Sequence, residues 1–195
     1  MSSLELPSHG RYDQELRSTW LNDPQFELTL PYYGFSHVDL AVGHGDEIVG
    51  HYYRWLKQRH ADVDSLRGLK NQLPGNHCIA PQAWRTRVPE ELYPTAFVAE
   101  RTIKYLENYS RTDRAKPFFL QCSFPDPHHP FTPPGRYWDL YDAEQITLPP
   151  SFNSAERPIV AHLQELYDER AHNRSNRDGQ RTIAITEREA REAIA

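Results

Sequence analysis

The chain has 195 residues, of which 38% are hydrophobic, so it is long enough for one domain with a sizeable core. Its formal net charge is −5 and it contains no basic stripe, so nucleic acid is not expected as a partner. No apolar run approaches the length of a membrane-spanning helix, and no membrane partner is expected.

The cysteines indicate a reducing environment. Cys78 and Cys122 lie far apart in the sequence and do not form the pattern of a disulfide framework. Cys122 lies within an apolar run, where a thiol is expected to be an inert core residue. No secretory signal pattern opens the chain, so we expect a cytoplasmic location.

The first elements are predicted from hydrophobic periodicity. Apolar residues alternate with polar ones over residues 26–30, which predicts a short strand, and residues 35–40 are a second candidate strand. Over residues 47–59 the apolar positions recur at helical spacing, which predicts a helix. Asp46 precedes that helix and is expected to cap it and to complement its dipole.

Three histidines, His37, His44 and His51, fall in this polar neighbourhood. They could form a metal site, or they could be ordinary surface and helix residues. Their spacing matches no zinc pattern, and no Cys or Glu-x-x-His partner accompanies them. The sequence therefore favours ordinary histidines, and we assign no metal ligand to this chain.

Residues 62–92 show no sustained period and are predicted to form a long irregular connection. A connection of this length inside a compact domain is usually either functional or disordered. A helix is predicted over residues 96–106, and the expected buried stripe on it consists of Ala96, Ala99, Ile103 and Leu106.

Residues 118–124 form the most apolar run of the chain. A short run of this kind, rich in aromatic residues and bounded by prolines, predicts a strand that is buried on both faces, as in a parallel sheet. The preceding helix would flank this strand, because helix followed by buried strand is half of a βαβ unit.

Directly after this run, Asp126, His128 and His129 stand on a loop that contains three prolines. Proline fixes its own φ and restricts the preceding residue, so the two imidazoles are expected on a stiff turn. Ligands bind beyond the carboxyl ends of the strands in open α/β sheets, which favours a chemical role. The alternative is a stiff surface loop whose histidines only form hydrogen bonds. Because adjacent residues in extended backbone project in opposite directions, we expect His128 to face the crevice and His129 to face the protein.

The end of the chain carries two further features. Residues 170–181 are highly polar and are predicted to form a solvated loop. Thr186 and Glu189 have the spacing of a capping box, which predicts the start of a helix. Ala195 follows without a C-cap glycine, so we interpret this helix as one that has lost its continuation.

Four segments together resemble the sulfatase family of the alkaline-phosphatase-like superfamily. They are Pro-Tyr-Tyr-Gly-Phe (31–35), Pro-Glu-Glu-Leu-Tyr-Pro-Thr-Ala-Phe-Val-Ala (89–99), Lys-Pro-Phe-Phe-Leu (116–120) and Asp-Pro-His-His-Pro-Phe-Thr-Pro-Pro (126–134). The resemblance covers the chain from about the Tyr-Gly-Phe turn to the final helix. It implies an α/β fold: an incomplete alkaline-phosphatase-like sandwich with a mostly parallel central sheet and flanking helices. Residues 1–195 would then be the middle segment of a sulfatase-like catalytic domain.

The resemblance also implies what this segment lacks. The family's Cys/Ser-x-Pro-x-Arg nucleophile motif, its metal-binding Asp pair and its Gly-Lys-x-His element would precede it, and an Asp-His-Gly or Asp-Asn metal motif would follow. None of these motifs occurs in the sequence. A divalent metal, calcium or manganese, is therefore expected for the full-length enzyme, with ligands outside this chain. Only the His-x-Pro histidine carries over, to His128, where it would contact the ester oxygens and stabilise or protonate the leaving group.

Three functions follow as hypotheses. The first is a segment of a metal-dependent hydrolase that cleaves sulfate esters, inactive in isolation, and the second is a phosphodiester or phosphonate monoester hydrolase of the same superfamily. Either would act on a small-molecule sulfate or phosphate ester. The third is a non-catalytic binding module that uses the aromatic pair Tyr137 and Trp138, although packing is the favoured role for this pair. The sequence assigns neither substrate-binding residues nor an oligomeric state.

Overall fold

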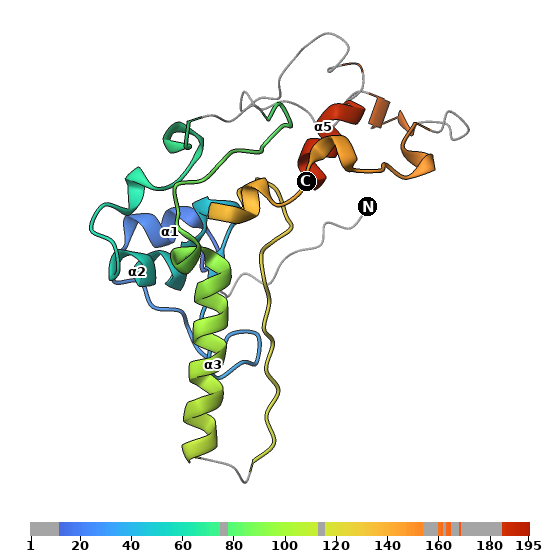
Figure 1. Ribbon diagram of the computed structural model, residues 1–195. Coiled ribbons are helices and arrows are strands. Elements are labelled where there is room, and N and C mark those ends of the chain that lie inside the picture. Colours follow the sequence, from blue (N-terminus) through green and yellow to red (C-terminus); the bar gives the residue numbers. More distant parts are fainter. Residues whose placement is uncertain are drawn as a thin grey trace.

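The structure is a computed structural model that describes residues 12–74, 78–112, 116–153 and 185–195, with positions 160, 161, 163, 164 and 168. Its helices are α1 (Arg17–Asn22), α2 (His51–Lys57), α3 (Pro94–Thr112) and α5 (Glu187–Ile194), and strands β1 (Ala41–Val42) and β2 (Val49–Gly50) form one antiparallel hairpin (Figure 1). In the part of the chain described here, no helix combines the length and the apolar character needed to cross a membrane.

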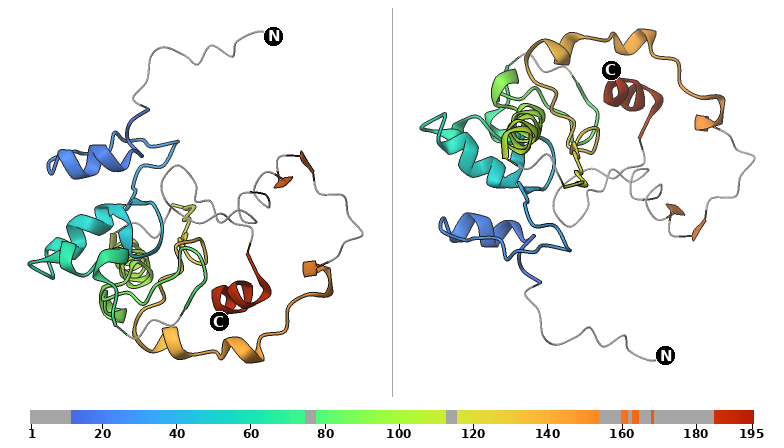
Figure 2. Two further views of the ribbon diagram at one scale, coloured as in Figure 1. Left: turned by 90° about the horizontal axis from the view of Figure 1, so that it is seen from above. Right: turned by 90° about the horizontal axis from the view of Figure 1, so that it is seen from below.

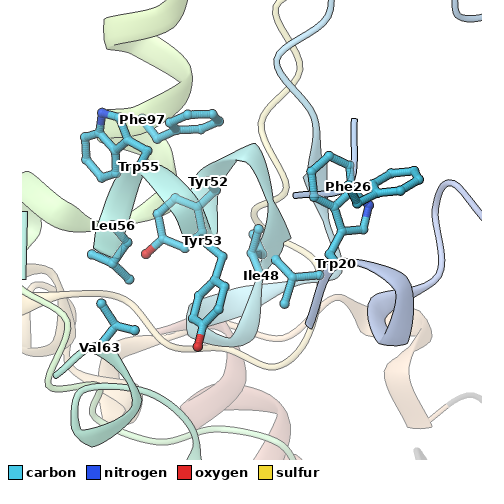
Figure 3. Close-up of a cluster of buried hydrophobic side chains, with 10 residues drawn as sticks. Trp20, Phe26, Ile48, Tyr52, Tyr53, Trp55, Leu56, Val63 and Phe97 are labelled. Atoms are coloured by element: carbon cyan, nitrogen blue, oxygen red, sulfur yellow. The ribbon is translucent and has the colours of Figure 1, made fainter. Parts of the chain in front are cut away.

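The core lies where α1, the hairpin and α2 meet (Figure 3). Its buried residues are Trp20, Phe26, Ile48, Val49, Tyr52, Tyr53, Trp55, Leu56, Val63 and Phe97. Phe97 is the contribution of α3, and its ring lies 5.5 Å from Trp55 and 5.7 Å from Tyr52, both edge-on. Full burial of one such side chain contributes about 1.5–3 kcal/mol, so this cluster anchors the start of α3 to α2.

The helix predicted over residues 47–59 begins only at His51, because the hairpin takes up the residues before it. Gly50 has a φ of 86°, and a Cβ atom there would lie 2.5 Å from the carbonyl oxygen of Leu40. Only glycine fits this close approach of the two strands. The prediction that Asp46 caps the helix is wrong, since Asp46 lies fully buried in a 3-10 turn (Gly45–Glu47).

The strands predicted over residues 26–30 and 35–40 are not formed, and β1 begins only at Ala41. Residues 26–30 have no neighbouring strand to pair with among the described residues, and they contribute Phe26 to the core instead. Its ring packs edge-on against Trp20, with the centroids 4.9 Å apart.

Residues 62–92 are held by a buried carboxylate rather than by regular structure. Their described part contains three short 3-10 turns, Val63–Ser65, Leu69–Asn71 and Glu90–Leu92. Asp46 Oδ2 accepts hydrogen bonds from the Gly68 N–H (3.2 Å), Trp84 Nε1 (3.1 Å) and Thr86 Oγ1 (2.6 Å). One side chain of the hairpin region therefore fixes three points along this connection.

The long helix α3 confirms the helix predicted over residues 96–106, but the predicted buried stripe is wrong. Ile103 is 56% exposed and Leu106 is 40% exposed, whereas Phe97 is buried. The face that packs is rotated around the helix axis from the expected one. It carries Phe97 at the core and, further along, Tyr105 and Tyr109, whose rings contact Phe118.

Residues 117–124 run extended beside α3 (Figure 1), and no strand pairs with them among the described residues. Thr102 Oγ1 lies 3.3 Å from Cys122 Sγ, and the rings of Tyr109 and Phe118 lie 4.5 Å apart. The expected burial on both faces is wrong here, because Phe119 is 77% exposed and Cys122 is exposed. The mostly parallel central sheet stays a prediction.

The capping box predicted for the last helix is confirmed. The Thr186 side chain accepts from the Glu189 N–H, and the Glu189 carboxylate accepts from the Thr186 N–H. Residues 135–150 curve around this helix (Figure 2). Glu192 Oε2 also accepts from the backbone N–H groups of Ile79 (2.6 Å) and Ala80 (3.0 Å). The polar loop predicted at 170–181 lies outside the described residues.

Candidate functional site

A cleft of about 950 Å³ opens beside α3. One wall is formed by residues 32–44, the second by the first turns of α3, and the third by the extended run at 119–125. His128 lines this cleft, as expected. His129 does not line the cleft, and both histidines are exposed, so the expectation that His129 faces the protein is wrong.

The loop that carries His128 is fixed at both ends by backbone hydrogen bonds. At its start the His128 N–H donates to the Pro125 carbonyl (3.2 Å). At its end the Phe131 N–H donates to the Gln82 carbonyl (2.7 Å), and the Trp84 N–H donates to the Phe131 carbonyl (3.1 Å). These bonds hold the histidine loop against residues 82–84.

A second contact brings His44 to the same loop. Gly45 has a φ of 57°, and a Cβ atom there would lie 2.8 Å from Pro130 Cγ and 3.0 Å from Thr132 Oγ1. The backbone of the turn therefore touches the histidine loop at a position where only glycine fits. The side chain before it, His44, consequently lies beside His128.

The imidazole rings of His44 and His128 are stacked, with centroids 3.5 Å apart and an interplanar angle of 9°. His128 Nδ1 lies 2.6 Å from the carbonyl oxygen of His129. Since a carbonyl can only accept, Nδ1 must carry a hydrogen. The other ring nitrogen of His128, Nε2, is therefore the atom that can take up or release a proton.

Charge near this pair is set by burial and by neighbouring residues. Burial lowers the pKa of His44, and the charges of His128 and His129 lower it further, whereas Asp126 opposes this shift. Burial raises the pKa of Asp126. The hydroxyls of Tyr93 and Thr95 donate hydrogen bonds to this carboxylate, each 3.4 Å long, and these bonds oppose the rise. The surroundings therefore disfavour a charge on His44.

The residues that line the cleft also include an ion pair. Arg101 of α3 donates to Asp39 at 2.8 Å, and His37 Nε2 lies 3.0 Å from the same carboxylate. Burial alone would raise the pKa of Asp39, but the hydrogen bond and charge of Arg101, together with His37, lower it below its ordinary value. Arg101 thus places a positive group on the cleft wall, with Asp39 as its counter-ion.

The residues present do not fit a divalent metal. Among the described residues, no three His, Cys, Asp or Glu side chains come together as a metal would require. The three histidines that could have formed a metal site make separate contacts instead. His37 contacts Asp39, and His44 stacks on His128. His51 Nδ1 accepts from the Leu40 N–H at 2.8 Å. We therefore derive no step through calcium or manganese at this site.

Sequence reasoning missed the role of His44. The available signal was its position between Gly43 and Gly45, since paired glycines mark a turn that can approach another segment closely. The segment that it approaches could not be identified from this signal.

Comparisons with known proteins agree with the resemblance, although no protein-family model and no solved structure matches the chain. The multifunctional alkaline phosphatase superfamily protein PehA of Trinickia caryophylli is 27% identical over 153 residues, which are 75% of this chain and 28% of that protein. The arylsulfatase of Clostridium perfringens (strain 13 / Type A) is 43% identical over 101 residues, 50% of this chain and 19% of that protein. The iduronate 2-sulfatase of Homo sapiens is 40% identical over 98 residues, 50% of this chain and 17% of that protein.

The resemblance to sulfatases and to the alkaline-phosphatase-like superfamily is therefore confirmed, and these relatives imply an alkaline-phosphatase-like fold. The chain spans between 17% and 28% of the length of these curated relatives.

Proposed function

We propose that this chain supplies one part of the active-site cleft of a sulfatase-like hydrolase, and that His128 acts on the ester oxygen. The observation that carries this proposal is the position of His128: it lines the cleft while its Nδ1 is occupied by the His129 carbonyl. The sulfatase relatives support the hydrolase class.

The chemistry assigned to His128 follows from its tautomer. When the bond between sulfur and the ester oxygen breaks, negative charge develops on the departing oxygen. A hydrogen-bond donor aimed at that oxygen lowers the barrier. With Nδ1–H committed to a carbonyl, His128 can donate through Nε2 only in its protonated form. His128 would therefore act as an imidazolium that passes its Nε2 proton to the leaving oxygen.

Sulfate esters are the preferred substrate class, because two of the relatives are named sulfatases and are 40–43% identical over the matched segments. A phosphodiester or phosphonate monoester is the second candidate. It is supported by PehA, a multifunctional alkaline phosphatase superfamily protein that matches 153 residues of this chain.

A binding module built on Tyr137 and Trp138 has weaker support. Neither residue is among those that line the cleft, and the Tyr137 hydroxyl donates to Glu90 at 3.0 Å. This contact occupies the Tyr137 hydroxyl.

For the whole protein we further propose a divalent metal, calcium or manganese, bound by residues outside this chain. The cytoplasm is proposed as its compartment, because Cys78 and Cys122 are thiols that form no disulfide.

Ester binding by the purified chain tests the proposal. An aryl sulfate and an aryl phosphodiester are each titrated into the chain while the imidazole NMR signals are followed. We expect the sulfate to shift the His128 signals, and His128→Ala to weaken binding about 10- to 100-fold, because hydrogen bonds to charged groups contribute about 1.5–3 kcal/mol. His129→Ala, one position away and outside the cleft, is the matched control and should bind as the unchanged chain does. Equal binding by His128→Ala and the unchanged chain would remove His128 from the site.

A further inference from the structure

We infer that His44 is a positioning residue for His128: the stacked pair takes up one proton, which His128 carries, while His44 stays neutral and holds the plane of the His128 ring. This inference rests on the proposed function, since it explains how the acting imidazole would be oriented and charged.

The geometry of the pair is the first step. A centroid distance of 3.5 Å with an interplanar angle of 9° places the two rings in full van der Waals contact. Face-to-face contact restricts rotation of the His128 ring out of its plane, and the Nδ1–H bond to the His129 carbonyl restricts rotation within it. Together they fix the direction in which Nε2 points, which matters because catalysis by a donor depends on its orientation.

Backbone packing brings the two stacked histidines together. Gly45 touches Pro130 and Thr132 directly, so the turn that carries His44 and the loop that carries His128 are packed against each other. Asp46, the next residue, is fully buried and anchored by Trp84 and Thr86. The two backbone segments that carry the rings are therefore held next to each other.

Electrostatics then decides which ring carries the proton. Two imidazolium rings in face contact repel each other strongly, so the pair resists a second proton. Burial lowers the pKa of His44, as do the charges of His128 and His129, and Asp126 is the group that opposes them. The Nδ1–H of His128 donates to the carbonyl of His129, so a proton taken up by His128 goes to Nε2 and makes that ring a cation. A neutral aromatic face beneath this cation is a favourable neighbour.

The alternative role for His44 is simple packing. In that case any ring or apolar group could replace His44, and the replacement would leave the titration of His128 unchanged. A proton-sharing pair makes a different prediction. The titration of His44 must be visible at His128, and a non-titrating aromatic side chain must preserve the orientation of His128 while removing the second titration.

The test is an NMR pH titration of the full chain with labelled histidines, with three variants. In the unchanged chain we expect the His44 signals to titrate below the ordinary histidine range, with a second, smaller inflection of the His128 signals at the same pH. His44→Phe should keep the ring-current shift of the His128 signals and remove the second inflection. His44→Ala should abolish both. His37→Ala, a cleft histidine whose ring lies 5.1 Å from Tyr105, should change neither.

Three outcomes would overturn the inference. The first is that His44→Ala leaves the His128 signals unaltered, and the second is that His44→Phe loses the ring-current shift to the same extent as His44→Ala. The third is that His44 and His128 titrate independently in the unchanged chain. The last readout needs no variant, so it decides the question even where a substitution unfolds the chain. None of these measurements requires an ester, so failure of ester binding would count against the proposed function alone. Where ester binding holds, His44→Ala should weaken it about tenfold and His44→Phe should restore it.

Discussion

Gly45 and Pro130 are in direct contact, and this contact joins the turn that carries His44 to the loop that carries His128. A Cβ atom on Gly45 would lie 2.8 Å from both the Cγ atom and the carbonyl oxygen of Pro130. Real Cβ atoms essentially never approach that closely, and the φ of 57° is one that other residues adopt only with strain. The position thus excludes a side chain for two separate reasons.

Gly45→Ala is therefore expected to lower the free energy of unfolding by about 2–4 kcal/mol, through backbone strain and overpacking together. Urea unfolding measures this loss. Gly135→Ala is the matched control, because Gly135 has a φ of 53° with nothing within 4 Å of the added Cβ. The control should lose only the strain, about 1 kcal/mol. Equal losses of unfolding free energy in the two variants would show that the contact with Pro130 does not contribute to stability.

Asp46→Ala should be among the most destabilising substitutions in the chain. It leaves the donors of Gly68, Trp84 and Thr86 without their acceptor inside the protein. Removing one member of a buried charged network costs about 3–5 kcal/mol. Asp23→Ala is the control, because the Asp23 carboxylate accepts from the Gln25 N–H at an exposed position. Its loss should be about 0.5 kcal/mol or less. A loss of that size at Asp46 would contradict the role of this carboxylate as the anchor of residues 62–92.

The case of Asp46 shows what local sequence patterns can predict and what they cannot. An Asp before a helical period is a sound signal for a cap, but its actual partners lie 22, 38 and 40 positions away. No periodicity encodes such distances. The Thr186 capping box, in contrast, is complete within four residues, and it was predicted correctly.

The same distinction applies to the cleft. The proline-rich loop and the apolar run before it predicted that His128 would face a crevice, since both signals are local. The existence of α3 was predictable from its period, but the direction of its packed face was not. Apolar residues occur on two sides of this helix, and only the positions of α2 and Phe118 decide which side is covered. His44 became part of the site through the contact of Gly45 with Pro130, which is tertiary.

The stability of the chain should decrease as the pH falls below about 6.5, the ordinary pKa of histidine. Burial lowers the pKa of His51 in the folded chain, and its Nδ1 accepts from the Leu40 N–H. The unfolded chain therefore binds a proton at a pH where folded His51 does not, so acid favours unfolding until the pH passes below the lowered value. The charged groups that act on this imidazole are Asp39, Arg54, Glu27 and Arg101.

His51→Asn is the informative variant for this pH dependence. The Asn side-chain oxygen can replace Nδ1 as the acceptor for Leu40 but cannot be protonated in this range. Unfolding midpoints measured between pH 5 and pH 8 should therefore vary less in the variant than in the unchanged chain. His129→Asn, at an exposed position, should keep the dependence of the unchanged chain. If His51→Asn and the unchanged chain lose stability in parallel, His51 is not the group responsible.

Thr186→Ala should loosen α5 by removing the acceptor for the Glu189 N–H. Loss of an N-cap side chain costs about 1 kcal/mol. Amide hydrogen exchange in residues 187–194 should accelerate about fivefold, the factor that corresponds to such a loss. Thr186→Ser keeps the hydroxyl and should retain the protection. Equal protection in the Ala and Ser variants would mean that the contacts of Glu192 with Ile79 and Ala80, and not the cap, hold the helix.

The last prediction concerns turnover: the purified chain alone should hydrolyse neither an aryl sulfate nor an aryl phosphodiester at a measurable rate, with calcium or manganese present. Hydrolysis needs an activated nucleophile, a cation to offset the anionic oxygens and a donor for the leaving group. Burial raises the pKa of Cys78 to about 11, so this thiol is protonated near neutral pH and is a poor nucleophile. Within the described ranges no cluster of side chains fits a metal, and His128 can supply only the donor.

One histidine cannot provide the barrier reduction of about 8 kcal/mol or more that enzymes achieve. General acid catalysis alone contributes about 10²- to 10⁴-fold, which would leave the hydrolysis of these esters too slow to detect. The assay compares the unchanged chain with His128→Ala after two independent purifications, since a contaminating hydrolase would produce the same activity in both. Turnover that persists through both purifications and disappears only in His128→Ala would show that this chain carries a complete catalytic site, with a nucleophile other than Cys78.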